Sequence, residues 1–247
     1  MKKLAFGAML FASMAYAHFG MVIPSASSTD SDKISLTYKF AHPFEGTLMD
    51  IPMPKSAGVL INGKKSDMLK TLKEQKQNNM RFYNANYNIK EPAVHIFYVD
   101  LEPYFEPNEQ IFIHHTAKSV VDAYGAGDGW DQSVGLKAEI VPLTRPFGLY
   151  AGNNFSGVVM YKGKPAADVI VEVEYLNDKG LKAPSEDHIT QEIKTNKRGE
   201  FSFTMPLAGW WGFSALLSDD EKIKKDGKTY DVELGAIIWV ETKNYQK

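Results

Sequence analysis

The residue with the clearest chemical potential is His18, which directly follows Ala15-Tyr16-Ala17. Two small residues flanking a third form the usual cleavage site of a secretory signal. Cleavage after Ala17 would give His18 a free α-amine beside its imidazole. Because the amine has a pKa of about 8 and the imidazole one of about 6.5, a divalent metal can displace both protons near neutral pH. The sequence therefore predicts an N-terminal metal chelate at His18.

The residues before this site match the other parts of a secretory signal. Lys2 and Lys3 supply its positive start, and an apolar run extends from Leu4 to Met14. This run is shorter than the roughly 20 apolar residues that span a bilayer. We therefore expect residues 1–17 to be a cleaved signal peptide, and the mature chain to be periplasmic and not itself membrane-spanning.

His42 is the leading candidate for a further metal ligand. It follows the apolar segment Ile34–Phe40, which is typical of a strand, and Pro43 would end that strand at the rim of a sheet. Glu45 lies close enough in sequence to bind a metal or to orient His42 through its second ring nitrogen. An N-terminal chelate supplies two nitrogens, and one or two more neutral imidazoles would complete a site for nickel or copper.

His114 and His115 are adjacent, so in a strand they point to opposite faces and at most one should join such a site. We favour His114, which shares a face with Phe112. His95 and His188 are interpreted as ordinary surface or strand-end residues. The predicted metal ligands are thus His18, His42, His114 and Glu45, for Ni²⁺ or alternatively Co²⁺ or Cu²⁺.

Composition excludes several classes of protein. The formal net charge is −2, and loss of Lys2 and Lys3 would make it more negative, so no basic face is offered to nucleic acid. The chain has no cysteine, which leaves nitrogen, oxygen or thioether ligands for any metal. No nucleophile elbow, zinc-protease helix or phosphate-binding glycine loop is present. We therefore do not expect an enzyme.

Segments rich in β-branched and aromatic residues recur between Gly, Pro, Asn and Asp, which predicts an all-β fold of two β-sandwich (immunoglobulin- or transthyretin-like) domains. The prolines and glycine of residues 142–148 mark the boundary between them. We expect an N-terminal domain over residues 18–145, carrying the metal site, and a C-terminal domain over 146–247. A short helix is expected over Ser66–Gln77, where Met68, Leu69 and Leu72 share a face.

The C-terminal half resembles the carboxypeptidase-regulatory-like, transthyretin-type β-sandwich. The likeness rests on Gly163-Lys164-Pro165, Val169–Val173, Thr195-Asn196-Lys197-Arg198-Gly199 and Gly209-Trp210-Trp211-Gly212-Phe213. Such a resemblance implies a fold and leaves function open.

A second resemblance covers nearly all of the mature chain. His18–Pro24, Ala41–Glu45, Pro103–Pro107, Gly129–Asp131 and Glu139–Asn153 look like the exported component that accompanies energy-coupling-factor nickel and cobalt transporters. This resemblance implies a periplasmic accessory protein that supports nickel uptake by an inner-membrane transporter. It also implies histidines at positions 18, 42 and 114.

Two alternatives remain open from sequence. The chain could be a binding or adhesion module of two β-sandwiches with no metal, in which case replacing His18 and His42 would change nothing. It could also be a copper enzyme that uses an N-terminal histidine brace to oxidise a polymer, as lytic polysaccharide monooxygenases do.

Overall fold

The structure is a computed structural model that describes residues 18–246. The expected signal peptide, residues 1–17, lies outside the described residues. Within 18–246 the chain forms strands and two single-turn 3₁₀ helices, η1 (Leu69–Thr71) and η2 (Glu186–His188), with no α-helix. No helix in this part of the chain is long and apolar enough to cross a membrane. The all-β fold class is confirmed.

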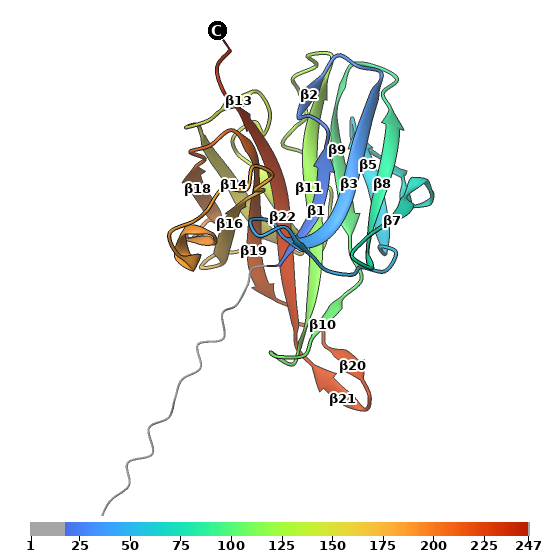
Figure 1. Cartoon of the computed structure of the whole chain (residues 1–247), viewed down its shortest axis with the longest axis vertical. Coiled ribbons are helices and arrows are strands. Elements are labelled where there is room, and N and C mark those ends of the chain that lie inside the picture. The colour runs from blue at the N-terminus through green and yellow to red at the C-terminus, as the bar shows by residue number, and fades with distance from the viewer. Residues whose placement is uncertain (1–17, 247) are drawn as a thin grey trace, which may run out of the picture.

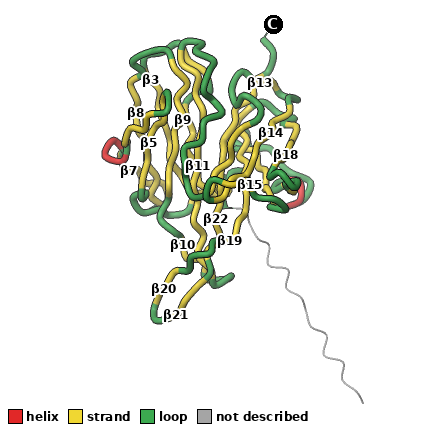
Figure 2. Tube along the Cα trace, turned by 180° about the vertical axis from the view of Figure 1, so that it is seen from behind, coloured by secondary structure: helices red, strands yellow, loops and turns green. Residues whose placement is uncertain are grey.

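A central sheet of 11 strands runs through both halves of the chain. Its main path is β17 (Gln191–Lys194), β16 (Ile170–Tyr175), β19 (Gly209–Ser218), β22 (Val232–Lys243), β11 (Ile111–Ala123), β9 (Ala93–Asp100), β5 (Ser56–Ile61) and β6 (Lys64–Asp67). The short strands β2 (Ser28–Thr29), β10 (Tyr104–Glu106) and β13 (Leu149–Tyr150) pair alongside it. Figures 1 and 2 show two lobes side by side, joined where β11 runs along β22.

Two smaller sheets cover the central sheet. One contains β1 (Phe19–Pro24), β3 (Lys33–His42), β4 (Thr47–Leu48), β7 (Lys73–Gln77) and β8 (Met80–Asn88). The other contains β12 (Ala138–Pro142), β14 (Asn154–Tyr161), β15 (Lys164–Pro165) and β18 (Glu200–Thr204). The remaining strands, β20 (Ile223–Lys225) and β21 (Lys228–Tyr230), form a hairpin that projects from one end of the molecule (Figure 1).

The two covering sheets lie on opposite faces of the central sheet. Along β22, Ile237 and Trp239 belong to the core beneath β1 and β3, whereas Ala236 and Ile238 belong to the core beneath β14. Consecutive strand residues point to opposite faces, so each covering sheet makes its own sandwich with a different part of the central one. The predicted β-sandwich architecture is confirmed.

Strands from the two halves of the chain pair with each other. β11 and β22 pair in parallel from Phe112 opposite Val232 to Ser119 opposite Trp239. In addition β12, which precedes the predicted boundary at residue 145, pairs with β14 beyond it. Strands from both sides of residue 145 therefore share sheets. The division at this residue stays a prediction.

A buried ion pair holds the loop that follows β11. Lys118 and Glu139 are almost fully buried, and the Lys118 Nζ donates to a Glu139 oxygen at 2.7 Å. Glu139 also accepts hydrogen bonds from the Ser133 hydroxyl and from the backbone N–H groups of Val134 and Gly135. The loop is therefore fixed against the central sheet beside a small apolar cluster that includes Val134 and Phe147.

The predicted helix over Ser66–Gln77 is wrong. This segment contains the end of β6, the single turn η1 and the strand β7, which pairs with β8. Met68 and Leu72 are buried as their spacing suggested, but one 3₁₀ turn is enough to bury both. The polar run Lys73–Gln77 then pairs as an exposed edge strand.

Candidate metal site

The first strand, β1, is fixed between the two lobes by residues of both. Gly20 lies so close to β11 that a Cβ on it would be 3.0 Å from the His115 Cβ. Its N–H donates to His115 Nδ1 at 3.1 Å, and its carbonyl accepts from Trp239 Nε1 at 3.0 Å. Since His115 is on β11 and Trp239 on β22, β1 lies at the junction of the lobes.

The pairing of β1 with β3 brings His18 and His42 together. Phe19 lies opposite Ala41 in this antiparallel pair, so the residues next to them, His18 and His42, are cross-strand neighbours. Their ring centroids are 4.7 Å apart with the ring planes at 46°. The His18 ring also stacks on Phe40 at 5.5 Å. Two of the four predicted ligands therefore meet.

Glu106 adds a carboxylate that the sequence did not single out. Its Oε2 lies 4.0 Å from His18 Nε2, and the residue is 8% exposed. Tyr104, on the same short strand β10, lies 6.3 Å from the His18 ring. This strand reaches the site because it folds back on β11, with Glu106 opposite Ile111.

Burial keeps His18 and His115 uncharged. It lowers the pKa of His18 to about 4, with a further lowering by the charge of His42 and an opposing effect of Glu106. Burial likewise lowers the pKa of His115 to about 3, with smaller contributions from His18 and His114. Neutral imidazole is the form that binds a metal, so the ring of His18 needs to lose no proton at neutral pH.

The other two predicted ligands lie in different surroundings. His114 Nε2 is 2.6 Å from Asp100 Oδ1 and forms an ion pair with it when protonated. Its neighbour His115 is the one that faces inward, with its ring 5.3 Å from Phe40. Glu45 is exposed in the turn after β3, where its charge acts on Glu174. Metal ligation by His114 and by Glu45 stays a prediction.

Two small cavities adjoin the site. One of about 140 Å³ is lined by Phe40, Tyr104, His115 and their neighbours. A second of about 90 Å³ is lined by His42, Met21 and Leu176 among others. Among residues 18–246, no three His, Asp or Glu side chains are already arranged to hold a metal ion. The geometry provides an imidazole pair with a carboxylate nearby, and any further donor must come from elsewhere.

The remaining histidines lie elsewhere. His95 is 1% exposed, with Nδ1 3.0 Å from the Ala93 carbonyl, and it packs against Tyr87 and Phe97. His188 is exposed beside Ser185.

The family described as "Domain of unknown function (DUF4198)" matches residues 15–219. This chain belongs to the DUF4198 family. The match extends over β1, β3, β10 and β11 and so includes every residue of the candidate site in this DUF4198 protein. Among curated proteins, no significant match was found.

Solved structures similar to this DUF4198 protein are distant. They include fibronectin(III)-like modules of CbhA from Clostridium thermocellum (9% identity, TM-score 0.21, covering 88% of this chain and 95% of that one). A chimeric titin Z1Z2 (8%, 0.25, 90% and 97%) and MtrC from Shewanella baltica OS185 (7%, 0.27, 92% and 70%) are others. At these TM-scores they carry no argument about function. The resemblances to a nickel-transport component and to a carboxypeptidase-regulatory-like domain stay predictions.

Proposed function

We propose that this DUF4198 protein binds Ni²⁺ at its mature N-terminus in the periplasm and supports delivery of the ion to an inner-membrane transporter. The observation that carries the proposal is the contact between His18 and His42, with ring centroids 4.7 Å apart. The two residues are 24 positions apart in sequence and meet only because β1 pairs with β3.

The donors of such a site come from three groups. Cleavage after Ala17 would supply the α-amine of His18, which forms a chelate with the imidazole of the same residue. His42 would supply a further imidazole. Glu106, 4.0 Å from His18 Nε2, can balance the charge of the ion or orient the ring.

The kind of ligand sets which metals are suitable. Nitrogen donors suit Ni²⁺, Co²⁺ and Cu²⁺, and Cu²⁺ has the highest intrinsic affinity. Selection of nickel would then rest on geometry and on which metal is available. A site with few protein ligands keeps exchangeable water, which suits an ion that must be handed on. The transporter partner and the periplasmic location rest on the signal sequence and on the resemblance of the chain to nickel-transport components.

The test is isothermal titration of Ni²⁺, and in parallel Co²⁺, Cu²⁺ and Zn²⁺, into protein whose N-terminus has been verified by mass spectrometry. Two changes should weaken nickel binding roughly tenfold or more, about 1.4 kcal/mol: His42→Ala, and one extra residue before His18, which moves the free amine away from the ring. His114→Ala is the matched control, because it removes an imidazole that pairs with Asp100 instead.

The controls separate the proposal from its alternatives. Loss of binding with His114→Ala but not with His42→Ala would overturn the proposed ligand set. Binding of no divalent metal would favour the metal-free binding or adhesion module. Tight copper binding accompanied by consumption of a reductant would favour the oxidative enzyme.

A further inference from the structure

The larger of the two cavities beside the histidine pair, about 140 Å³, has room for a small molecule. An apolar cavity of roughly 150 Å³ can hold benzene. Exposed Pro52 and Glu102 line the cavity, so it opens to solvent beside them. Its floor is made of buried residues: Phe40, Ile51, Leu101, Ile113 and His115. A ligand of about the size of benzene can therefore enter it from solvent.

Aromatic residues are concentrated at this cavity. Phe40 on β3 and Tyr104 on β10 both line it, with their ring centroids 5.7 Å apart. His115 on β11 lines it too, with its ring 5.3 Å from that of Phe40. Three elements that are far apart in sequence thus bring aromatic rings to one small space.

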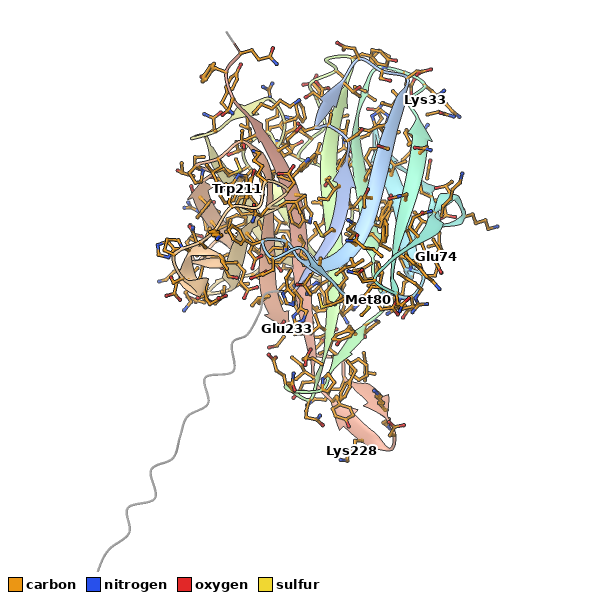
Figure 3. All side chains as sticks on the ribbon, viewed as in Figure 1. Lys33, Glu74, Met80, Trp211, Lys228 and Glu233 are labelled. Atoms are coloured by element: carbon orange, nitrogen blue, oxygen red, sulfur yellow. The ribbon has the colours of Figure 1, made fainter. Side chains whose placement is uncertain are left out.

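The aromatic ring that β10 gives to the cavity is that of Tyr104. Its neighbour Phe105 points to the opposite face, where it packs against Phe112. There the Lys225 Nζ lies 4.0 Å from the centre of the Phe105 ring (Figure 3 labels Lys228 at the tip of the same hairpin). An ammonium group over an aromatic ring is therefore a contact that this strand already makes on its other face.

The charged residues that line the cavity are acidic. Asp50 is neutralised by Arg81, whose Nε and Nη2 donate to its two carboxylate oxygens at 2.9 and 2.6 Å. Glu102 takes part in none of the ion pairs of residues 18–246. No lysine or arginine in this part of the chain lines the cavity. Burial lowers the pKa of His115 to about 3, so its ring is uncharged at neutral pH.

We propose that this cavity binds a small organic ammonium ion, with its carbon atoms against Phe40 and Tyr104 and its charge balanced by Glu102. Aromatic rings attract cations through the negative charge of their faces, and methylated ammonium groups are bound in this way. A trimethylammonium group donates no strong hydrogen bond, so a mostly apolar cavity leaves none of its donors unpaired. A metal ion would need several ligands around one point, and no three His, Asp or Glu side chains of residues 18–246 are arranged in that way.

The ammonium site is separate from the proposed metal ligands. Neither His18 nor His42 lines the cavity. Phe40 lies between the two sites, with its ring 5.5 Å from that of His18 and 5.3 Å from that of His115. Binding of an ammonium ion therefore requires no metal, and it goes beyond the nickel function proposed above.

The probe that tests the cavity is choline. The matched neutral compound is 3,3-dimethylbutan-1-ol, which has the same shape with carbon in place of the charged nitrogen. Both are titrated into nitrogen-15-labelled mature protein in a buffer containing a chelator, and binding is followed by NMR. Choline should cause saturable shifts of the amides of Ile51, Leu101 and Tyr104. The neutral compound should bind about tenfold more weakly, since this ratio, about 1.4 kcal/mol, is typical of a cation on aromatic rings.

Substitutions at the cavity separate the role of the ring from that of the charge. Tyr104→Leu should weaken choline binding about tenfold, and Tyr104→Phe should restore it because the aromatic ring returns. Glu102→Gln should weaken choline binding by about threefold, since the carboxylate is exposed to water. It should leave binding of the neutral compound unchanged. Glu91→Gln is the matched control, because Glu91 is also exposed but precedes β9, whereas Glu102 follows that strand.

Three results would overturn the proposal: no saturable shifts with choline, equal affinity for the neutral compound, or equal losses with Tyr104→Phe and Tyr104→Leu. A loss with Glu91→Gln as large as that with Glu102→Gln would also overturn it, because the position of the charge would then not matter. If Tyr104→Leu does not fold, the neutral compound and Glu102→Gln still decide the question. Because a chelator is present throughout, failure of nickel binding at the histidines would leave these results unaffected.

Discussion

Replacement of Glu172 by glutamine should stabilise the protein, and only at higher pH. The pKa of this carboxyl is raised from its ordinary 4.5 to about 8, first by burial and then by neighbouring glutamates. Between those two values the folded chain holds a proton that the unfolded chain has lost. The free energy of unfolding therefore falls as pH rises through this window. Glutamine has nearly the same shape and cannot ionise, so the variant should lack the part of that fall that Glu172 contributes, while Glu174 and Glu233 keep their own parts.

The size of the effect follows from the two pKa values. A tenfold change in the acid dissociation constant corresponds to about 1.4 kcal/mol. The rise in the pKa of Glu172 from 4.5 to about 8 therefore limits its effect on the free energy of unfolding to about 5 kcal/mol. Glu172 is only partly buried, so water can stabilise its ionised form and reduce the cost of ionisation. Part of the rise in the pKa of Glu172 comes from the charge of Glu233 and not from burial. We therefore expect about 2 kcal/mol of added stability for Glu172→Gln at pH 9, and almost none at pH 4.

The assay is urea unfolding of wild-type and variant protein at pH 4 to 9, followed by tryptophan fluorescence, in buffers containing a chelator. Glu74→Gln is the control, because this glutamate is exposed on the edge strand β7. Its stability difference from wild type should stay near zero at every pH. A Glu172→Gln difference that does not grow between pH 5 and 9, or a variant less stable than wild type at pH 9, would refute the reasoning.

Two further substitutions test how the lobes are held. Glu139→Gln should cost about 3–5 kcal/mol in urea unfolding and more than Lys118→Met, because it leaves the buried ammonium without its charged partner, whereas Glu139 keeps three other donors when Lys118 is replaced. Equal costs, or a larger cost for Lys118→Met, would contradict this. Gly235→Ala should cost about 2 kcal/mol and weaken nickel binding in titration, because its Cβ would be 2.2 Å from His115 Cδ2 and would displace the ring that holds Gly20. A stable variant with normal nickel affinity would contradict it.

The strands were predictable where one face of each is buried. Val169, Val171 and Val173 occupy every second position, and the structure buries all three valines. Alternation of this kind is a local property, so sequence suffices to find it. The predicted helix over Ser66–Gln77 was wrong because the local spacing of apolar residues did not decide the structure there. Met68 and Leu72 have helical spacing, but their burial is set by the strands on either side.

The fold brings together two of the four predicted ligands, His18 and His42. A ligand could be predicted from the sequence only where the signal that marks it lies close to it along the chain. His18 and His42 were recognisable because each stands beside a local signal in the sequence: His18 follows the predicted cleavage site, and His42 lies at the end of β3. Glu106 was not, because it is one of several glutamates in this part of the sequence and no local signal distinguishes it from Glu102. Only the pairing of β10 with β11 brings it to His18. In the same way, sequence limits His114 and His115 to opposite faces, whereas only the packing of β1 on β11 shows that His115 faces Gly20.

The position of the candidate metal site depends on two strands of the central sheet, β11 and β22. His115 on β11 binds the Gly20 N–H, and Trp239 on β22 donates to the Gly20 carbonyl. These two strands are far apart in sequence, and their parallel pairing could not be inferred from either one. Since the backbone of Gly20 is held from both sides, the placement of His18 depends on contacts from both lobes. The predicted boundary at residue 145 would separate Trp239 from the strand it holds, so the geometry of the histidine pair is a property of the joined lobes and not of the N-terminal half alone.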